Sequence, residues 1–433
     1  MASLKIAVIG GGSTYTPELV EGVIRRYEAL PVTELWLMDI DAEKLAVVGG
    51  LAQRMVAAAG LPIRVVLTGD RRAAIAGAQF VVTQFRVGGL QARARDERIP
   101  LQFGVIGQET TGPGGFMKAL RTIPVVLEIA REIRELAPEA WLINFTNPAG
   151  IVTEAVARYG EGVRAVGLCN VPITMRNTLA AMLGAPRETV TLDYVGLNHL
   201  SWARRVLVRG QDVTRQLLDR MEELMNMPNI PAIGLDLEAI RALGMIPSPY
   251  LRYYYARDAV LAKQLKAEKT RAEEVMAYEA QLLELYRNPE LREKPALLEK
   301  RGGAYYSDAA CALMAAIWND AREVHIVNVV NSGATPDLPY GAVVEVPAVV
   351  GRDRVTPLAV GRLEPAIRGL VQQVKAYEEL TVEAAVTGSR DLALQALIAN
   401  PLVPSVRVAR EMLPVLLEAS RPYLPQFFPE GRE

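Results

Sequence analysis

The sequence predicts an α/β protein that begins with a Rossmann-type, doubly wound parallel sheet and continues with a mixed α+β domain. Over about the first 170 residues, short apolar runs of β character alternate with helical patterns, which is the spacing of βαβ units. The first apolar run ends in three consecutive glycines. The second half shows alternating strand patterns and a long charged helix instead. We therefore expect two domains, over residues 1–170 and 171–433.

The elements of the first half follow in a regular order. Pro17 and Pro124 stand where the first turn of a helix tolerates proline. Strands are expected at residues 4–9, 34–38, 63–70, 80–85, 140–145 and 163–169. Helices are expected at residues 16–30, 42–59, 72–76, 125–136 and 149–159. These strands would complete a doubly wound sheet near residue 170.

The second half is expected to begin with antiparallel strands over residues 189–208. A tyrosine-rich segment at 249–255 precedes a charged helix at 266–286. Other expected elements are helices at 212–226 and 233–243, strands at 323–329 and 341–350, and helices at 357–379 and 382–399. The sequence contains no internal repeat, so we expect both halves to pack into one body with a cleft between them.

The composition excludes several classes of protein. The 433 residues are 50% hydrophobic with a net charge of −1, so disorder is excluded. The even balance of 48 basic and 49 acidic residues argues against a nucleic-acid partner. No apolar run is long enough to span a membrane, and no signal-peptide cleavage site precedes the first strand pattern. Two cysteines are too few for a disulfide framework. A cytoplasmic protein is therefore expected.

The glycine run predicts a dinucleotide site. Gly10, Gly11, Gly12 and Ser13 join a strand to a helix, where the backbone can approach a pyrophosphate. Asp39 ends the second strand and can accept hydrogen bonds from a ribose diol, which favours NAD over NADP. The third glycine of the usual pattern is replaced by Tyr15. The alternative is a structural glycine turn beside a solvated aspartate.

Cysteine and histidine are scarce enough to restrict any metal site. Cys169 ends the sixth strand and His199 follows 30 residues later; a thiolate and an imidazole suit Zn, Mn or Fe. The alternative is that both are core residues, since a lone buried cysteine usually behaves as a small hydrophobe. Cys311 lies in an apolar helical pattern and His325 in a strand pattern, and both are interpreted as structural.

Several polar, glycine-containing segments follow the strands, and they indicate a pocket. Arg86 and Arg95 could bind an anionic group there, or could be surface arginines. Ordinary turns are the alternative reading for each segment. The segments are residues 84–97, 107–115, 144–150, 249–255 and 301–308.

Together these strings resemble family 4 of the glycoside hydrolases, which depend on NAD and a divalent metal. The resemblance runs from the first strand past residue 300. The strings are IGGGSTYTPELV, DID, QFRVGGL, GQETTGPGGF, NFTNPAG, GLCNVP, GLNHLSW, PYLRYYY, TRAEEVM and RGGAYYS. The form Cys-Asn-Val-Pro at residues 169–172 is most similar to the 6-phospho-β-glucosidases. The resemblance also implies a fold like that of lactate and malate dehydrogenases.

The resemblance implies a role for individual residues. Cys169, at the end of the first domain, and His199, in the second, would bind Mn²⁺, and Tyr250 would be the catalytic base. Asn170 stands where the α-specific enzymes carry an aspartate that can donate a proton; we expect it to contact the substrate during catalysis. Three further residues, Arg95, Asn147 and Arg271, match positions that contact the sugar phosphate or its hydroxyls.

The implied reaction is redox-assisted elimination. NAD⁺ would take a hydride from sugar C3, Tyr250 would remove the C2 proton, the aglycone would leave C1, water would add, and NADH would return the hydride. The substrate would be a phosphorylated disaccharide such as cellobiose 6-phosphate, or an aryl 6-phospho-β-glucoside. A homodimer or homotetramer is also expected.

Three alternatives remain open from the sequence. The first is an NAD-dependent 2-hydroxy-acid dehydrogenase, whose base is a histidine paired with an aspartate; here Asn198 precedes His199. The second is a sensor of NAD or sugar phosphate without activity. The third is a member of the family that acts on α-linked or unphosphorylated glycosides.

Overall fold

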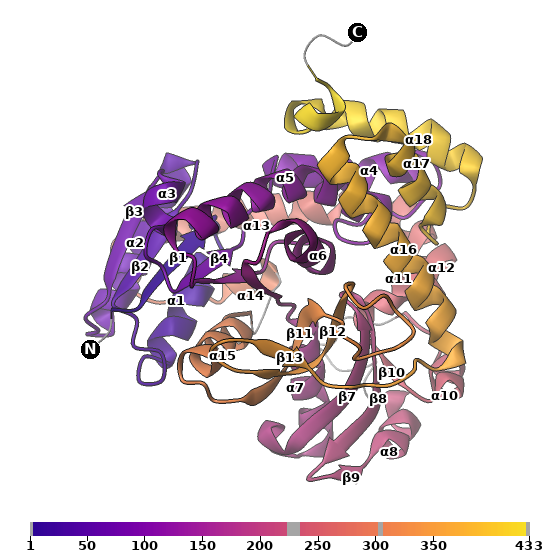
Figure 1. Ribbon diagram of the computed structural model, residues 1–433, viewed down its shortest axis with the longest axis horizontal. Helices are drawn as coiled ribbons and strands as arrows, with labels where there is room; N and C mark the ends of the chain where they lie inside the picture. The colour runs from indigo at the N-terminus through magenta and orange to yellow at the C-terminus, as the bar shows by residue number, and fades with distance from the viewer. Residues whose placement is uncertain (1–2, 223–233, 302–305, 430–433) are drawn as a thin grey trace.

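The computed structural model describes residues 3–222, 234–301 and 306–429 and contains a sheet of nine strands (Figure 1). Six parallel strands lie in the order β3-β2-β1-β4-β5-β6, which is the strand order of dinucleotide-binding folds. They are β1 Lys5–Ile9, β2 Glu34–Met38, β3 Arg64–Thr68, β4 Phe80–Thr83, β5 Trp141–Asn144 and β6 Arg164–Gly167. The prediction of a doubly wound parallel sheet is confirmed.

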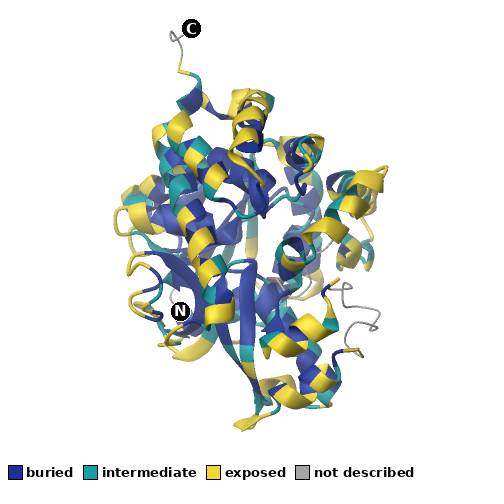
Figure 2. Cartoon of the chain, turned by 90° about the vertical axis from the view of Figure 1, so that its right-hand side faces the viewer, coloured by how far each residue is buried: buried dark blue, intermediate teal, exposed yellow. Residues whose placement is uncertain are grey.

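Helices cover both faces of this sheet, and the central strands β1, β4 and β5 are therefore buried on both faces. Ile6 and Val8 face one core with α1 and α2, whereas Ala7 and Ile9 face a second core with α3 and α5. Figure 2 shows buried strands at the centre and exposed residues on the outer helices. The helices of this half are α1 Thr16–Arg25, α2 Ala42–Ala58, α3 Arg71–Ile75, α4 Gly89–Gln102, α5 Gly112–Leu136 and α6 Ala149–Tyr159.

Strands from the second half extend the same sheet. β11 (Glu323–Val330) pairs antiparallel with β6, and β12 (Val343–Val350) and β13 (Val355–Pro357) follow. A separate antiparallel sheet is built around the hairpin of β7 (Val190–Leu197) and β8 (Leu200–Val208). It is completed by β9 Gln211–Asp212 and β10 Ile246–Pro247. The domain boundary at residue 170 stays a prediction.

The remaining helices belong to the second half. They are α7 Val171–Leu183, η1 Arg187–Thr189, α8 Thr214–Asp219, α10 Leu237–Leu243, η2 Pro249–Leu251, α11 Arg252–Tyr255, α12 Arg257–Lys266, α13 Arg271–Arg287, α14 Leu297–Arg301, α15 Tyr306–Trp318, α16 Pro365–Thr387, α17 Arg390–Ala399, α18 Val406–Ala419, η3 Arg421–Tyr423 and η4 Pro425–Phe427. Across the three described ranges, none of the helices has the length and apolar character needed to cross a membrane.

Two predictions for the first half were wrong. Residues 84–97 were expected to form a loop, but α4 begins at Gly89; its buried positions include charged residues, so no apolar period marks the helix. The helix expected at 125–136 begins at Gly112, with Pro124 in its interior. Proline cannot donate a hydrogen bond to the carbonyl four residues earlier. Here the Gln426 side chain donates to the Leu120 oxygen at 3.1 Å instead.

Helix boundaries also differ in the second half. The helix expected at 266–286 corresponds to α13 and begins later, at Arg271, because Thr270 and Glu273 form a capping box there. The helix expected at 357–379 begins at Pro365 and runs to Thr387. The helices expected at 212–226 and 233–243 correspond to α8 and α10, and residues 223–226 and 233 lie outside the described residues.

A buried ion pair connects α4, α5 and the C-terminal segment. Arg121 donates to both carboxylate oxygens of Asp96, at 2.9 and 2.5 Å, and to the Ser420 hydroxyl at 3.0 Å. Asp96 and Arg121 are almost completely inaccessible to solvent. Because neither charge reaches water, each depends on the other for its stability.

Replacing Asp96 by asparagine should destabilise the protein strongly. The change leaves the Arg121 guanidinium buried without a counter-charge, and the expected loss in free energy of unfolding is about 3–5 kcal/mol. The urea midpoint of unfolding, followed by circular dichroism, measures this loss. Glu411→Gln is the matched control, because it breaks an exposed pair with Arg407 on α18, expected to be worth less than about 0.5 kcal/mol. Equal midpoints for the two variants would contradict the assignment.

Candidate active site

A cavity of about 1610 Å³ lies at the carboxyl ends of the parallel strands. Its wall includes the glycine turn after β1, Asp39 after β2, Arg86 after β4, Asn147 after β5 and Asn170 after β6. Parts of β10, η2, α12 and α13 complete the wall. Ligands of doubly wound sheets bind at this edge of the sheet, so the fold makes the cavity the candidate site.

The glycine turn packs directly against the end of β2. The backbone N–H groups of Gly10 and Gly11 donate to the Met38 oxygen at 2.9 and 2.8 Å, and that of Gly12 donates to Oδ2 of Asp39 at 2.9 Å. A Cβ at Gly11 would lie 2.8 Å from Leu37, and one at Gly12 would lie 2.9 Å from the Asp39 side chain. Only glycine allows this approach, which gives a backbone cradle with a carboxylate beside it.

The structure brings Cys169 and His199 together. The Cys169 Sγ lies 3.4 Å from Nε2 of His199, and both side chains are buried. His199 has φ +66° in the two-residue turn between β7 and β8. Burial raises the pKa of the Cys169 thiol and lowers the pKa of His199 to about 3. A neutral imidazole keeps a lone pair for a metal ion.

Two protein ligands would leave a metal ion with open coordination positions. Within the described part of the chain, no group of three or more His, Cys, Asp or Glu side chains could hold a metal ion. A thiolate with an imidazole is nevertheless a donor set that suits Mn, Fe or Zn. Substrate oxygens or water can occupy the other positions, as in catalytic metal sites.

Tyr250, on η2, lines the cavity next to His199. Its ring, on η2, stacks on the His199 ring with centroids 3.7 Å apart and planes 3° apart. Burial raises the pKa of the Tyr250 hydroxyl, Cys169, Tyr253 and Glu109 raise it further, and Arg93 opposes them. The hydroxyl therefore needs added positive charge nearby to act as a base.

The other residues selected from the sequence are divided by the structure. Arg86, Asn147, Asn170 and Arg271 line the cavity. Arg95 is not among the described residues that line the cavity. Arg93, two positions earlier on α4, lines it instead. Arg271, at the start of α13, donates to Glu274 at 2.7 Å and to the Lys300 carbonyl at 2.9 Å.

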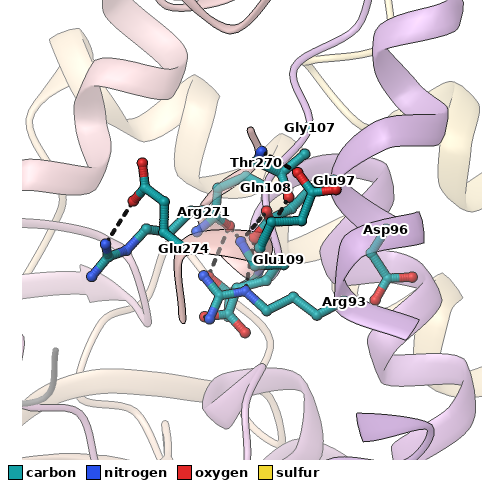
Figure 3. Close-up of polar contacts among 12 residues, drawn as sticks. Arg93, Asp96, Glu97, Gly107, Gln108, Glu109, Thr270, Arg271 and Glu274 are labelled. Atoms are coloured by element: carbon teal, nitrogen blue, oxygen red, sulfur yellow. Dashed lines mark hydrogen bonds and ion pairs between the residues drawn. The ribbon is translucent and has the colours of Figure 1, made fainter. Parts of the chain in front are cut away.

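A charged cluster at the cavity was not found from the sequence. Glu109 contacts three cations: Arg86 at 2.5 Å, Lys118 at 3.0 Å and Arg93 at 3.2 Å. Arg93 also pairs with Glu97 at 2.7 Å, and Figure 3 shows Arg93, Glu97 and Glu109 together. Three cations against two carboxylates leave a positive excess, which suits an anionic ligand.

Burial and the neighbouring charges together determine the pKa values in this cluster. Although burial alone would raise it, Arg86, Arg93 and Lys118 hold the pKa of the Glu109 carboxyl well below its usual value. Burial and the charge of Arg86 together lower the pKa of Lys118 to about 7, although Glu109 opposes the change. The glycines of the segment GQETTGPGG were a signal in the sequence for this close packing. Gly107 and Gly114 have no space for a side chain against the backbone oxygens of Glu97 and Gln108.

The two residues interpreted as structural lie away from this cavity wall. Cys311, on α15, is completely buried, and its sulfur contacts the Leu19 oxygen of α1 at 3.9 Å. His325, on β11, lies 3.3 Å from a carboxylate oxygen of Glu323. Neither is among the described residues that line the cavity.

Comparison with known proteins identifies the family. Residues 5–185 match the model of family 4 glycosyl hydrolases, and residues 194–403 match that of the family's C-terminal domain. A protein of Bacillus subtilis (strain 168) described as "Probable 6-phospho-beta-glucosidase" is 53% identical over 433 residues, with 98% of each chain covered.

Solved structures agree. The 6-phospho-beta glucosidase from Thermotoga maritima, solved with manganese, NAD⁺ and glucose-6-phosphate, has a TM-score of 0.90 and 40% identity, covering 97% of this chain and 99% of that one. Malate dehydrogenase from Plasmodium falciparum, at 13% identity and a TM-score of 0.54 over 90% of this chain and 99% of that one, shares the fold. The expected dehydrogenase-like fold is confirmed. The chain belongs to family 4 of the glycosyl hydrolases.

Proposed function

We propose that this protein hydrolyses 6-phospho-β-glucosides, such as cellobiose 6-phosphate, with the help of NAD and a divalent metal ion, most favourably Mn²⁺. The observation that carries the proposal is that His199 contacts both Cys169 and Tyr250, and that His199 and Tyr250 line one cavity. The same cavity includes Gly10, Gly12 and Asp39. A dinucleotide and a metal-assisted base can therefore act on one substrate.

The residues present fit both cofactors. Gly10, Gly11, Gly12 and Ser13 would hold the pyrophosphate at the start of α1, and Asp39 would accept hydrogen bonds from the ribose. Cys169 and His199 would hold Mn²⁺. When bound, NAD⁺ accepts a hydride from sugar C3 and later returns it, and the cation supplies the positive charge that acidifies the neighbouring C2–H.

Tyr250 would remove the C2 proton. Its oxygen takes the proton as the phenolate, the C1–O bond to the aglycone breaks, and the aglycone oxygen takes up a proton from solvent. After water has added at C1, the phenol gives a proton back to C2. Stacking on His199 fixes the orientation of the Tyr250 ring. Asn170 lines the cavity and follows the thiol ligand directly, so its amide would donate a hydrogen bond to a sugar oxygen rather than a proton.

The charge of the cavity wall supports a phosphorylated substrate. Arg86, Arg93 and Lys118 surround Glu109, and Arg271 lies on the same wall. Asn147 would contact the sugar hydroxyls, and Arg86 and Arg271 would contact the phosphate. The role in substrate binding expected for Arg95 stays a prediction. The β-linkage is supported by Asn170 and by the relatives named for 6-phospho-β-glucosides.

A 2-hydroxy-acid dehydrogenase is not favoured by the geometry. Such an enzyme needs a histidine held by an aspartate. His199 instead directs Nε2 toward the Cys169 sulfur, and its buried Nδ1 atom has no hydrogen-bond partner among the residues that the structure describes. The stacked Tyr250 ring covers the imidazole face, which leaves His199 as a metal ligand.

The thiol ligand bears on where the enzyme works. Cys169 and Cys311 are both free, and a thiolate ligand is lost when it is oxidised. A reducing compartment such as the cytoplasm keeps the ligand intact, which supports a cytoplasmic location. Assembly as a homodimer or homotetramer stays a prediction.

The reaction should incorporate solvent hydrogen at C2. With cellobiose 6-phosphate, NAD⁺, Mn²⁺ and a thiol reductant in D₂O, proton NMR should show cleavage together with deuterium at C2 of the released glucose 6-phosphate. Tyr250→Phe should lower both rates at least about 100-fold without changing NAD⁺ affinity. Cleavage without deuterium, or full activity of the variant, would contradict the proposed base. Cleavage of α-linked or unphosphorylated sugars alone would contradict the substrate class.

Removing the thiol ligand should remove the metal. Cys169→Ser is expected to weaken Mn²⁺ binding at least about tenfold, because a hydroxyl is a poor substitute for a thiolate. Electron paramagnetic resonance of unbound Mn²⁺ measures this affinity, and added chelator should abolish cleavage by the unmodified enzyme. Cys311→Ser serves as the control, since that thiol is buried against α1. Unchanged Mn²⁺ binding by Cys169→Ser would refute the metal assignment.

Asp39 should determine the preference for NAD. Asp39→Ala removes the acceptor for the ribose and for the Gly12 N–H, so the Kd for NAD⁺ should rise about tenfold or more, as for a lost hydrogen bond to a charged group. Discrimination against NADP⁺ should decrease in parallel. Asp70→Ala, which removes the N-cap of α3, is the control for a lost surface carboxylate. Fluorescence titration that gives equal NAD⁺ affinities would exclude this role.

A further inference from the structure

One fully buried carboxylate behind the Cys169–His199 pair has no part in the steps described above. Glu345, on β12, has no exposed surface. Its Oε1 atom accepts hydrogen bonds from the side-chain amides of Asn198 at 3.1 Å and Asn328 at 3.2 Å, and its Oε2 atom accepts from the Tyr194 hydroxyl at 3.1 Å. A buried carboxylate is tolerated only when it is paired in this way.

The Asn198 contact leads to His199. These two residues form the turn between β7 and β8, and His199 has a left-handed backbone there. The Asn198 side chain also hydrogen-bonds with the Cys169 sulfur, which opposes the rise that burial causes in the pKa of that thiol. One amide therefore connects the buried carboxylate with both proposed ligands. A Cβ at Gly150 of α6 would lie 3.0 Å from the Asn198 Cβ, so a glycine at this position lets α6 pack closely against the turn.

The Asn328 contact leads to the strand that carries Cys169. Asn328, on β11, is the pairing partner of Gly167 on β6. Its amide lies 3.5 Å from the Gly167 oxygen, and a Cβ at Gly167 would lie 2.9 Å from the Asn328 Cβ. The chain then reaches Cys169 two residues later. The positions of both ligands are thus set by hydrogen bonds to the same carboxylate.

We infer that Glu345 is a positioning residue for the metal site, which sets the separation and direction of the Cys169 and His199 side chains through Asn198 and Asn328. The inference rests on the proposed function, in which these two side chains hold Mn²⁺. Partners one layer behind the ligands of a metal commonly change metal affinity about 10–100-fold when they are replaced. Among the hydrogen bonds of the described residues, none joins Glu345 directly to Cys169 or His199.

Two substitutions at the same position test the inference. Glu345→Leu removes every acceptor at nearly constant volume and should weaken Mn²⁺ binding about 10–100-fold. Glu345→Gln keeps an oxygen for the two amides and should restore the affinity to within about threefold of the unmodified enzyme. The readouts are the resonance of unbound Mn²⁺ and the thiolate charge-transfer absorption of enzyme loaded with Co²⁺, both with NAD⁺ present. In the leucine variant the absorption band should shift or disappear.

Glu378→Gln is the matched control. Glu378 is also a buried carboxylate, but its partner is Lys375 on α16, at 2.5 Å. It should change the thermal unfolding temperature and leave Mn²⁺ affinity and the Co²⁺ spectrum unchanged. Equal losses of Mn²⁺ affinity in the control and in Glu345→Leu would mean general destabilisation and would overturn the inference.

The outcomes separate this inference from the proposed function. If the unmodified enzyme itself binds no Mn²⁺, the proposed metal site fails. If it binds Mn²⁺ and a folded Glu345→Leu variant binds equally well with the same spectrum, only the positioning role fails. Should the leucine variant not fold, Asn198→Ala breaks the link to the hairpin alone, and it should show the same loss of Mn²⁺ affinity; unchanged affinity would again overturn the inference.

Discussion

The antiparallel pairing of β11 with β6 is the contact on which the site depends. β6 is the last strand of the dinucleotide-binding sheet and leads to Cys169, whereas β11 and β12 come from the second half of the chain. Glu345 of β12 contacts Tyr194 of β7 and Asn198 at the tip of the β7–β8 hairpin. Because the two halves share one sheet, β12 lies where the Glu345 side chain can fix the tip of the β7–β8 hairpin, and with it His199, beside Cys169. This rigidity suits a site that must align a thiol, an imidazole and a phenol.

Electrostatics explains why so many charges lie beneath this cavity. Glu109 is surrounded by Arg86, Arg93 and Lys118, and Glu97 takes part of the charge of Arg93. A purely positive cluster would be costly to bury, whereas a cluster in which carboxylates offset most of the positive charge can remain folded and still attract an anion. Glu97 also accepts a hydrogen bond from the Ala272 N–H of α13. The charged network therefore positions Arg271 as well.

Much of the first half could be predicted from the sequence, because strands buried on both faces have a clear apolar pattern. The helix α4 could not, since Arg93, Asp96 and Glu97 are buried in ion pairs and hide its period. Without α4, the sequence could not show whether Arg93 or Arg95 faces the cavity, because residues two apart on a helix point about 200° from each other. The candidate site residues Cys169, His199 and Tyr250 were predicted through motifs. Their mutual contact required β11 and β12, which no local pattern assigns to the first sheet.

The bond from Gln426 to the Leu120 carbonyl has a consequence for the order in which the chain can be completed during synthesis. The Leu120 carbonyl, which receives no hydrogen bond from Pro124, accepts one from Gln426, 306 positions later. The Arg121 guanidinium likewise donates to Ser420, which is synthesised much later. The nine-stranded sheet is complete only after its edge strand β13, which ends at Pro357, has been synthesised. A ribosome must therefore synthesise the chain as far as Gln426 before the first domain is fully bonded. The nascent nucleotide domain depends on C-terminal residues, in contrast to domains that fold one after another from the N-terminus.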